Sequence, residues 1–327
     1  YHRMPQEGVV VVTVNTRLGS LGLLAHPELS RESGNGSSGS YLYLDLMAAL
    51  KWVQENIGEF GGDPANVTLW GQSGGGWKAA GLIASPSAKG LFHKAIIHSG
   101  GGPYPATLQQ SEAWGQQYFA RLGVTTLEQA RTLPWEQLAS VYRAMPAPPG
   151  GGVTIDGNFL PDTPLNMYAT GRANAIPMLL MANLGELPES NDFIGFYTKA
   201  LKSNADKGIQ SYAAIFDQVP ANWRTSGVRS IHSLDLPYAF GVYDEPTEWI
   251  WKALSGAAGG VVPQLGEPDR VVSQGMLTSW SQFARTGNPN KAVGGSVDWP
   301  AWTSAGDHYL HLNNGLSIRR GFSAVPN

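Results

Sequence analysis

The stretch Asn66-Val-Thr-Leu-Trp-Gly-Gln-Ser-Gly-Gly-Gly76 decides the fold of this 327-residue chain. Its first five residues form an apolar run of strand length, and an alanine-rich stretch of helical composition follows through Ile83. Between the two, Gly71-Gln-Ser-Gly-Gly75 matches G-x-S-x-G, a pattern typical of a sharp turn from strand to helix. We therefore expect Ser73 to stand at the carboxyl end of a short apolar strand, with its hydroxyl raised above the sheet.

That position suits a nucleophile. A helix N-terminus favours developing negative charge, and the turn would aim the Gly74 N–H at an oxyanion formed next to Ser73. The glycines on either side would let the chain pass close to the strained serine. The alternative is a glycine-rich turn with an incidental serine, and the flanking strand and helix argue against it.

The rest of the chain alternates strands with helices. Apolar runs of strand length occur at Val9–Val14, which we expect to be a central strand, and at 94–98, 177–182 and 211–216. Helical spacing of apolar residues predicts an amphipathic helix over 42–57 and a long terminal helix over 271–286. This alternation predicts an α/β fold with a mostly parallel sheet.

Composition limits the possible ligands. The net charge is −3, 14% of the residues are charged, and no apolar stretch is long enough to span a membrane. We therefore expect a small, neutral or apolar ligand, with no nucleic-acid partner and no membrane span. The absence of cysteine excludes disulfides and thiolate metal sites, and it leaves the compartment and the oligomeric state open.

Two further patterns suggest cofactors or metals only weakly. Gly34-Asn-Gly-Ser-Ser-Gly39 fits the dinucleotide-binding pattern G-x-G-x-x-G, but polar residues precede it in place of a strand. His308 and His311 could pair on a metal, but with no third ligand at a clear spacing we interpret them as surface histidines of one strand. We expect no cofactor and no metal.

A serine nucleophile needs a base and a carboxylate that orients it, and in this fold class they follow in the order serine, acid, histidine. Three histidines lie far enough downstream to serve: His232, His308 and His311. Three acids follow the strand predicted at 177–182, where the active sites of parallel sheets gather: Glu186, Glu189 and Asp192. Glu186 follows that strand most directly.

Four longer segments outside the serine turn also have recognisable sequences. They are Val9-Val-Val-Val-Thr-Val-Asn-Thr-Arg-Leu-Gly19, Asn56-Ile-Gly-Glu-Phe-Gly-Gly-Asp-Pro-Ala-Asn-Val-Thr68, His232-Ser-Leu-Asp-Leu-Pro-Tyr-Ala-Phe-Gly241 and Trp280-Ser-Gln-Phe-Ala-Arg-Thr-Gly-Asn-Pro-Asn290. In this order the chain resembles the type-B carboxylesterase family, which includes cholinesterases and bacterial para-nitrobenzyl esterases. The resemblance implies an α/β-hydrolase fold, a mostly parallel central sheet flanked by helices, and one domain over 1–327.

The resemblance also implies a site. Ser73, Glu186 and His232 would be a catalytic triad that hydrolyses a small-molecule carboxylic ester through an acyl-enzyme. The family's H-G-G-G loop lies upstream of its counterpart of Val9, so the chain would be N-terminally incomplete and Gly74 its remaining oxyanion-hole donor. Only 46 positions separate Glu186 from His232, which implies a shortened lid region. The alternative is a catalytically weak or inactive binding or adhesion protein on the same scaffold.

Overall fold

A single mixed sheet forms the centre of the molecule. The computed structural model describes residues 3–102, 104–186, 192–245, 249–290 and 297–325. Within these ranges the sheet has six strands in the order β1-β2-β5-β6-β7-β8, all parallel except β8, which runs antiparallel to β7. Their bounds are β1 Thr68–Gln72, β2 Lys94–His98, β5 Met178–Asn183, β6 Tyr212–Phe216, β7 His308–Leu312 and β8 Leu316–Arg320.

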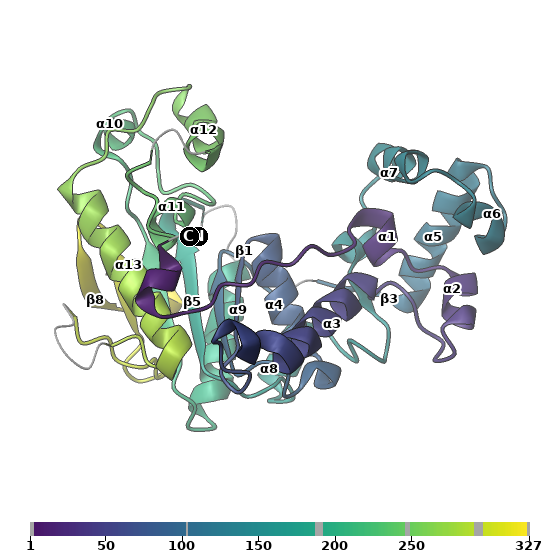
Figure 1. Ribbon diagram of the computed structural model, residues 1–327, viewed down its shortest axis with the longest axis horizontal. Helices are drawn as coiled ribbons and strands as arrows, with labels where there is room; N and C mark the ends of the chain where they lie inside the picture. The colour runs from purple at the N-terminus through teal and green to yellow at the C-terminus, as the bar shows by residue number, and fades with distance from the viewer. Residues whose placement is uncertain (1–2, 103, 187–191, 246–248, 291–296, 326–327) are drawn as a thin grey trace.

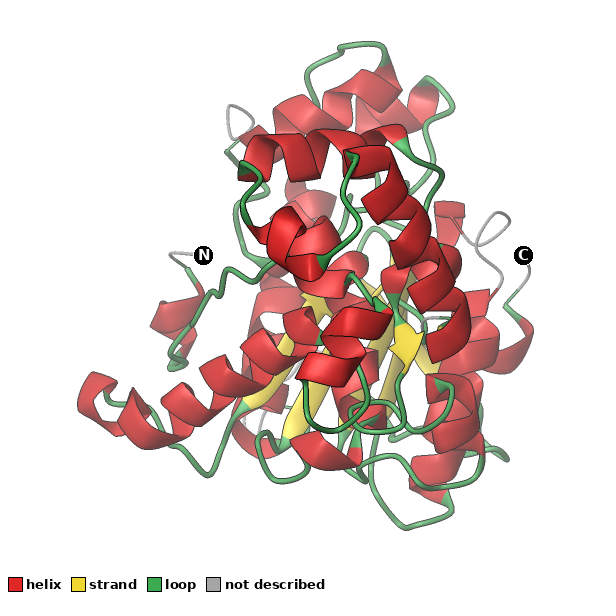
Figure 2. Ribbon diagram, turned by 90° about the vertical axis from the view of Figure 1, so that its right-hand side faces the viewer, coloured by secondary structure: helices red, strands yellow, loops and turns green. Residues whose placement is uncertain are grey.

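Helices cover both faces of this sheet (Figures 1 and 2). The longer ones are α3 Tyr41–Asn56, α4 Gly74–Ala84, α5 Leu108–Leu122, α7 Trp135–Ala144, α9 Asp192–Ala205 and α13 Glu267–Thr286. The shorter ones are α1 Gly19–Leu23, α2 Pro27–Glu32, α6 Leu127–Arg131, α8 Pro164–Ala169, α10 Ala221–Thr225, α11 Leu236–Ala239 and α12 Trp249–Ser255. The 3-10 turns that bear on the site are η1 Met4–Glu7 and η5 Leu184–Glu186.

Side-chain alternation along the strands divides the core into two layers. On β5, Leu180 and Ala182 belong to an apolar cluster with α4 and α9, whereas Leu179 and Met181 belong to a second cluster with α11 and α13. Successive strand residues point to opposite faces, so a strand between two helical layers must be apolar throughout. This explains why β5 reads as a continuous apolar run, and it leaves polar side chains to the strand ends.

A smaller lobe stands to one side of the sheet. Helices α5, α6 and α7 pack there with α1 and α2 around a third apolar cluster that includes Trp114, Tyr118 and Phe119 (Figure 1). The short strands β3 Ala106–Thr107 and β4 Thr154–Ile155 pair with each other where the chain enters and leaves this lobe.

The predicted central strand at Val9–Val14 is wrong. The run belongs to no helix or strand, and Val10, Val12 and Val14 are 46%, 43% and 44% exposed. It forms a strap from η1, beside α13, across to α1 (Figure 1). Within the described residues no backbone hydrogen bond involves this run, and β1 at the sheet edge pairs with β2 alone. A β-branched run has strand propensity, but it becomes a strand only where a neighbouring chain accepts its hydrogen bonds.

The other predicted elements are present. Strand β2 has the bounds read from the sequence, and α3 and α13 cover the two predicted helices with small shifts at their ends. No helix in the described part of the chain is both long and apolar enough to cross a membrane.

Candidate active site

Ser73 stands in the sharp turn between β1 and α4. Its backbone angles are φ 55° and ψ −122°, a region that residues other than glycine rarely adopt. Its N–H donates to the carbonyl of His98 at 2.9 Å, and its carbonyl accepts from the Trp77 N–H at 3.0 Å. The hydroxyl does not cap α4, although serine at a helix N-cap usually does. The strained turn therefore leaves the hydroxyl free for another task.

Close backbone crossings explain part of the glycine pattern. A Cβ on Gly71 would lie 2.2 Å from the backbone of Gly75, so any larger residue would force the turn apart. A Cβ on Gly76 would meet the Gly100 Cα at 3.0 Å, where β2 ends beside α4. A Cβ on Gly75 would enter open space. The expectation that both flanking glycines are needed for space therefore holds for Gly71 and is wrong for Gly75. A side chain on Gly71 would collide with the Gly75 backbone, whereas a side chain on Gly75 itself would meet no neighbouring atom.

Glu186 and His232 lie together beyond the carboxyl ends of the strands. Glu186 is buried in η5, directly after β5, and its Oε2 is hydrogen-bonded to the Nδ1 of His232. Its Oε1 accepts from the hydroxyl of Ser99 and from the N–H of Asn183, the latter at 2.9 Å. Three donors thus hold one carboxylate in a fixed orientation, which fixes the plane of the imidazole in turn.

The free nitrogen of that imidazole faces the end of β1. His232 Nε2 lies 3.3 Å from the side-chain nitrogen of Gln72, the residue before Ser73. With the ring proton on Nδ1 toward Glu186, Nε2 accepts from the Gln72 amide. Among the described residues no hydrogen bond joins the Ser73 hydroxyl to His232. The structure therefore brings the histidine to the neighbour of the serine, and Gln72 occupies the lone pair that a nucleophile would use.

The surroundings of His232 favour its charged form. The pKa of the ring is raised above its ordinary value, chiefly because Glu186 accepts a hydrogen bond from it. The negative charges of Glu186 and Asp235 act in the same direction, while partial burial opposes them. A partly exposed imidazole with a raised pKa is suited to take up a proton and return it once the Gln72 amide moves away.

The remaining candidates lie elsewhere or outside the described residues. Glu189 lies outside them, and Asp192 is the first residue of α9. His308 and His311 are on β7, where His311 is buried with Nε2 3.5 Å from the Asp217 carboxylate. The surface position expected for His311 is therefore wrong. The described residues contain no cluster of histidine, aspartate and glutamate that could hold a metal.

Several contributing residues were not among the predicted site residues. Ser99, Asn183 and Asp235 all bear on Glu186 or on the loop of His232. Ser99 and Asn183 share a position, because Ser99 directly follows β2 and Asn183 ends the adjacent strand β5. Polar residues directly after buried parallel strands were the clue that could have found them.

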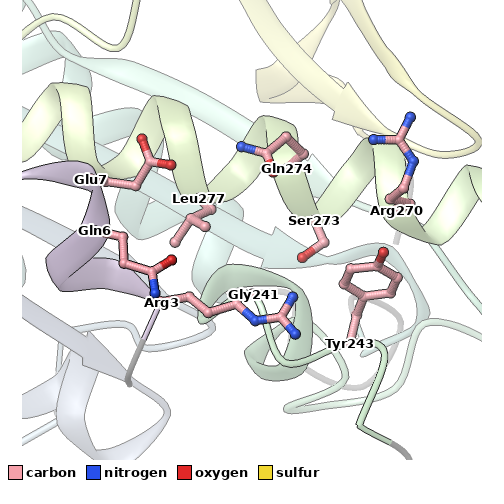
Figure 3. Close-up of a pocket in the computed structure, with 9 residues that line it drawn as sticks. All are labelled: Arg3, Gln6, Glu7, Gly241, Tyr243, Arg270, Ser273, Gln274 and Leu277. Carbon is pink, nitrogen blue, oxygen red and sulfur yellow. The ribbon is translucent and has the colours of Figure 1, made fainter.

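A separate pocket of about 360 Å³ lies between η1, the end of α11 and α13 (Figure 3). None of the candidate site residues lines it. Its two guanidinium groups already have acidic partners: Arg3 pairs with Asp244 at 2.7 Å, and Arg270 pairs with Glu267 at 2.5 Å. These pairs leave little unbalanced charge to attract a ligand.

Comparisons with known proteins show which family the chain belongs to. The sequence pattern described as Carboxylesterase family matches residues 2–194 and 191–325. A fumonisin B1 esterase from Sphingopyxis macrogoltabida is 32% identical over 355 residues, 93% of this chain and 64% of that protein. A para-nitrobenzyl esterase from Bacillus subtilis (strain 168) is 28% identical over 96% of this chain and 71% of its own length.

Solved structures give the same picture. One para-nitrobenzyl esterase structure superposes with a TM-score of 0.78 at 26% identity, over 96% of this chain and 72% of the other. A thermophilic para-nitrobenzyl esterase superposes with a TM-score of 0.79 at 25% identity, over 97% of this chain and 73% of the other. These structures have the α/β-hydrolase fold expected from the sequence, and this chain spans about 64% of the first relative's length.

Proposed function

Because the chain belongs to the carboxylesterase family, we propose that it hydrolyses carboxylic esters, with Ser73 as nucleophile, His232 as base and Glu186 as the carboxylate that orients the base. One observation carries this proposal. The imidazole bound to Glu186 turns its free nitrogen toward Gln72, next to a serine with φ 55° that does not cap its own helix. Gln72 and His232 are 160 positions apart in the sequence, so the fold, and not local chain geometry, brings them together.

The proposed reaction has two displacements. The Ser73 Oγ attacks the ester carbonyl carbon while its proton passes to His232 Nε2. The tetrahedral intermediate then collapses, and the alcohol leaves with that proton. Water repeats the sequence on the acyl-enzyme and restores the serine. For Nε2 to take the proton, the Gln72 amide must first give up its hydrogen bond to the ring.

Negative charge on the intermediate needs donors. The Gly74 N–H lies in the first turn of α4, where N–H groups have no partner within the helix. We assign it one oxyanion contact. A single removed donor costs on the order of 10² to 10³ in rate, so this contact alone supports a slow enzyme, and further donors would speed it.

The low content of charged residues and the names of two relatives support a proposal for the substrate class. The chain carries 14% charged residues, and its relatives include enzymes named for fumonisin B1 and for para-nitrobenzyl esters. We propose small, largely apolar esters as substrates and choose a para-nitrobenzyl ester as the probe substrate.

A fluorophosphonate probe tests the proposal directly. We expect the wild-type chain to be labelled at Ser73 and Ser73→Ala to be unlabelled. Ser233→Ala is the matched control, because Ser233 also has a positive φ, 71°, and follows His232 in the chain. Labelling that survives Ser73→Ala would refute the assignment of the nucleophile. No labelling of the wild type, together with no ester turnover, would favour the inactive binding protein.

A further inference from the structure

We propose that His98 is a positioning residue for this site, holding the loop that carries His232 in place through Asp235 and Asn183. The inference rests on the proposed function and extends it to a second, buried histidine. Among the described residues, the hydrogen bonds of the His98 ring go to Asp235 and Trp280, and none joins it to the Ser73 hydroxyl or to His232. His98 is the last residue of β2, and both it and Asp235 are 0% exposed.

Two hydrogen bonds fix the state of the His98 ring. Its Nδ1 lies 2.7 Å from the Asp235 carboxylate, and its Nε2 lies 2.6 Å from the indole nitrogen of Trp280 on α13. An indole N–H can only donate, so Nε2 must accept and the ring proton must lie on Nδ1, toward Asp235. Because both ring nitrogens are engaged within the core, His98 has a single tautomer and no free edge for chemistry.

The Asp235 carboxylate, held by His98, in turn holds the loop of His232. The second oxygen of Asp235 accepts from the side-chain nitrogen of Asn183 at 3.2 Å. The same nitrogen donates to the carbonyl of Ile231, the residue before His232, at 2.6 Å. The N–H of Asn183 donates to Glu186 at 2.9 Å. Asn183 therefore links the Glu186 carboxylate, the backbone of Ile231 and the Asp235 carboxylate through its hydrogen bonds.

The pair also contributes charge. Glu186 and Asp235 are the charged groups that act on His232, and Gln72 faces it from β1 as a neutral amide. Burial of the Asp235 carboxylate costs desolvation free energy, which its hydrogen bonds to His98 and Asn183 offset. Loss of the His98 donor would therefore loosen Asp235 and the loop of His232, and so weaken the interaction of both carboxylates with His232.

The test compares substitutions at His98 with the same change at another buried histidine. His98→Leu removes both hydrogen bonds, whereas His98→Gln keeps a donor for Asp235 and an acceptor for Trp280. His311→Leu is the control, because His311 is also buried and lies near a carboxylate, Asp217, outside the site. The readouts are kcat and KM with a para-nitrobenzyl ester, and the pKa of His232 by NMR of histidine-labelled protein.

We expect His98→Leu to lower kcat by about 10- to 100-fold, with KM changed less than about threefold, and to lower the pKa of His232. His98→Gln should restore both readouts to near wild type, and His311→Leu should change neither. Equal behaviour of His98→Leu and His311→Leu would overturn the proposal. If His98→Leu does not fold, Asp235→Asn, compared with Asp217→Asn, replaces it and must lower the pKa of His232.

The two proposals fail in different ways. A wild-type chain with neither turnover nor probe labelling contradicts the proposed function, while the titration of His232 still decides whether His98 and Asp235 position it. An active wild type whose His232 titration and kcat ignore every His98 and Asp235 substitution contradicts the positioning role alone.

Discussion

Two histidine–carboxylate pairs lie close together in this molecule and differ mainly in what their second ring nitrogen meets. His232 is bound to Glu186, and its side chain is 43% exposed with Nε2 toward Gln72. His98 is bound to Asp235, and its Nε2 is closed off by Trp280. The same chemical pair is thus a candidate base where the ring is partly exposed and its second nitrogen meets only a neutral side-chain amide, and a structural support where both nitrogens are bonded within the core.

Replacement of the two carboxylates should separate the pairs most strongly. Glu186→Gln would leave the shape of the site but orient the wrong tautomer of His232, and we expect kcat to fall by about 10⁴. Asp235→Asn should lower kcat far less, by about 10- to 100-fold. Steady-state kinetics with a para-nitrobenzyl ester measures both. Equal losses would mean that the two pairs are not different in kind.

For stability we expect the reverse of the order for activity: the closed His98–Asp235 pair should matter more than the His232–Glu186 pair. His98→Leu leaves the buried Asp235 carboxylate with Asn183 as its remaining donor and the Trp280 indole N–H without its acceptor, and we expect the free energy of unfolding to fall by about 3–5 kcal/mol. His232→Leu lies at a half-open surface and should cost about 1 kcal/mol. Urea unfolding, followed by tryptophan fluorescence, provides the comparison. A larger loss for His232→Leu would contradict it.

The pH dependence of turnover should report the open pair. A protonated imidazole cannot accept the serine proton, so kcat/KM should rise with pH through the pKa of His232. Because Glu186 raises that pKa, the midpoint of the acid limb should lie above the ordinary value of about 6.5. A pH–rate profile of the wild type measures the midpoint, and a midpoint below that value would refute the assignment of His232 as base.

The smallest effect is expected at Gln72. Gln72→Glu puts a negative charge beside His232 Nε2 and should raise the acid-limb midpoint by less than about one unit. At pH values above the limb, kcat/KM should change by no more than about threefold. Gln54→Glu adds the same charge on α3, where Gln54 donates to the carbonyl of Gly90, and should leave the profile unmoved. Identical profiles would remove Gln72 from the neighbourhood of the base.

The sequence located the reactive groups of the open pair more readily than the supports of the closed one. The serine turn is local, because β1, Ser73 and α4 are consecutive and their composition predicts them. The link from Glu186 to His232 was expected through the family resemblance. The link from His98 to Trp280 joins residues 182 positions apart, and no local pattern encodes it.

The same limit explains the error at Val9–Val14. The residues have the propensity of a strand, but a strand is a property of two neighbouring chains, and the neighbour is not visible in the run itself. His311 failed for a different reason. Both histidines were interpreted as surface residues because no third metal ligand accompanied them, but residues three positions apart on a strand point to opposite faces, and His311 is buried.

The exposed Val9–Val14 strap should make the protein sensitive to proteases at this segment. Proteases bind their targets as extended segments whose backbone groups are free, and this run presents free backbone groups between two folded anchors, η1 and α1. Limited digestion should therefore cut here early, and mass spectrometry of the fragments would show it. The cut would detach the segment that contains η1, while the strands and loops that hold Ser73, Glu186 and His232 would stay in one piece.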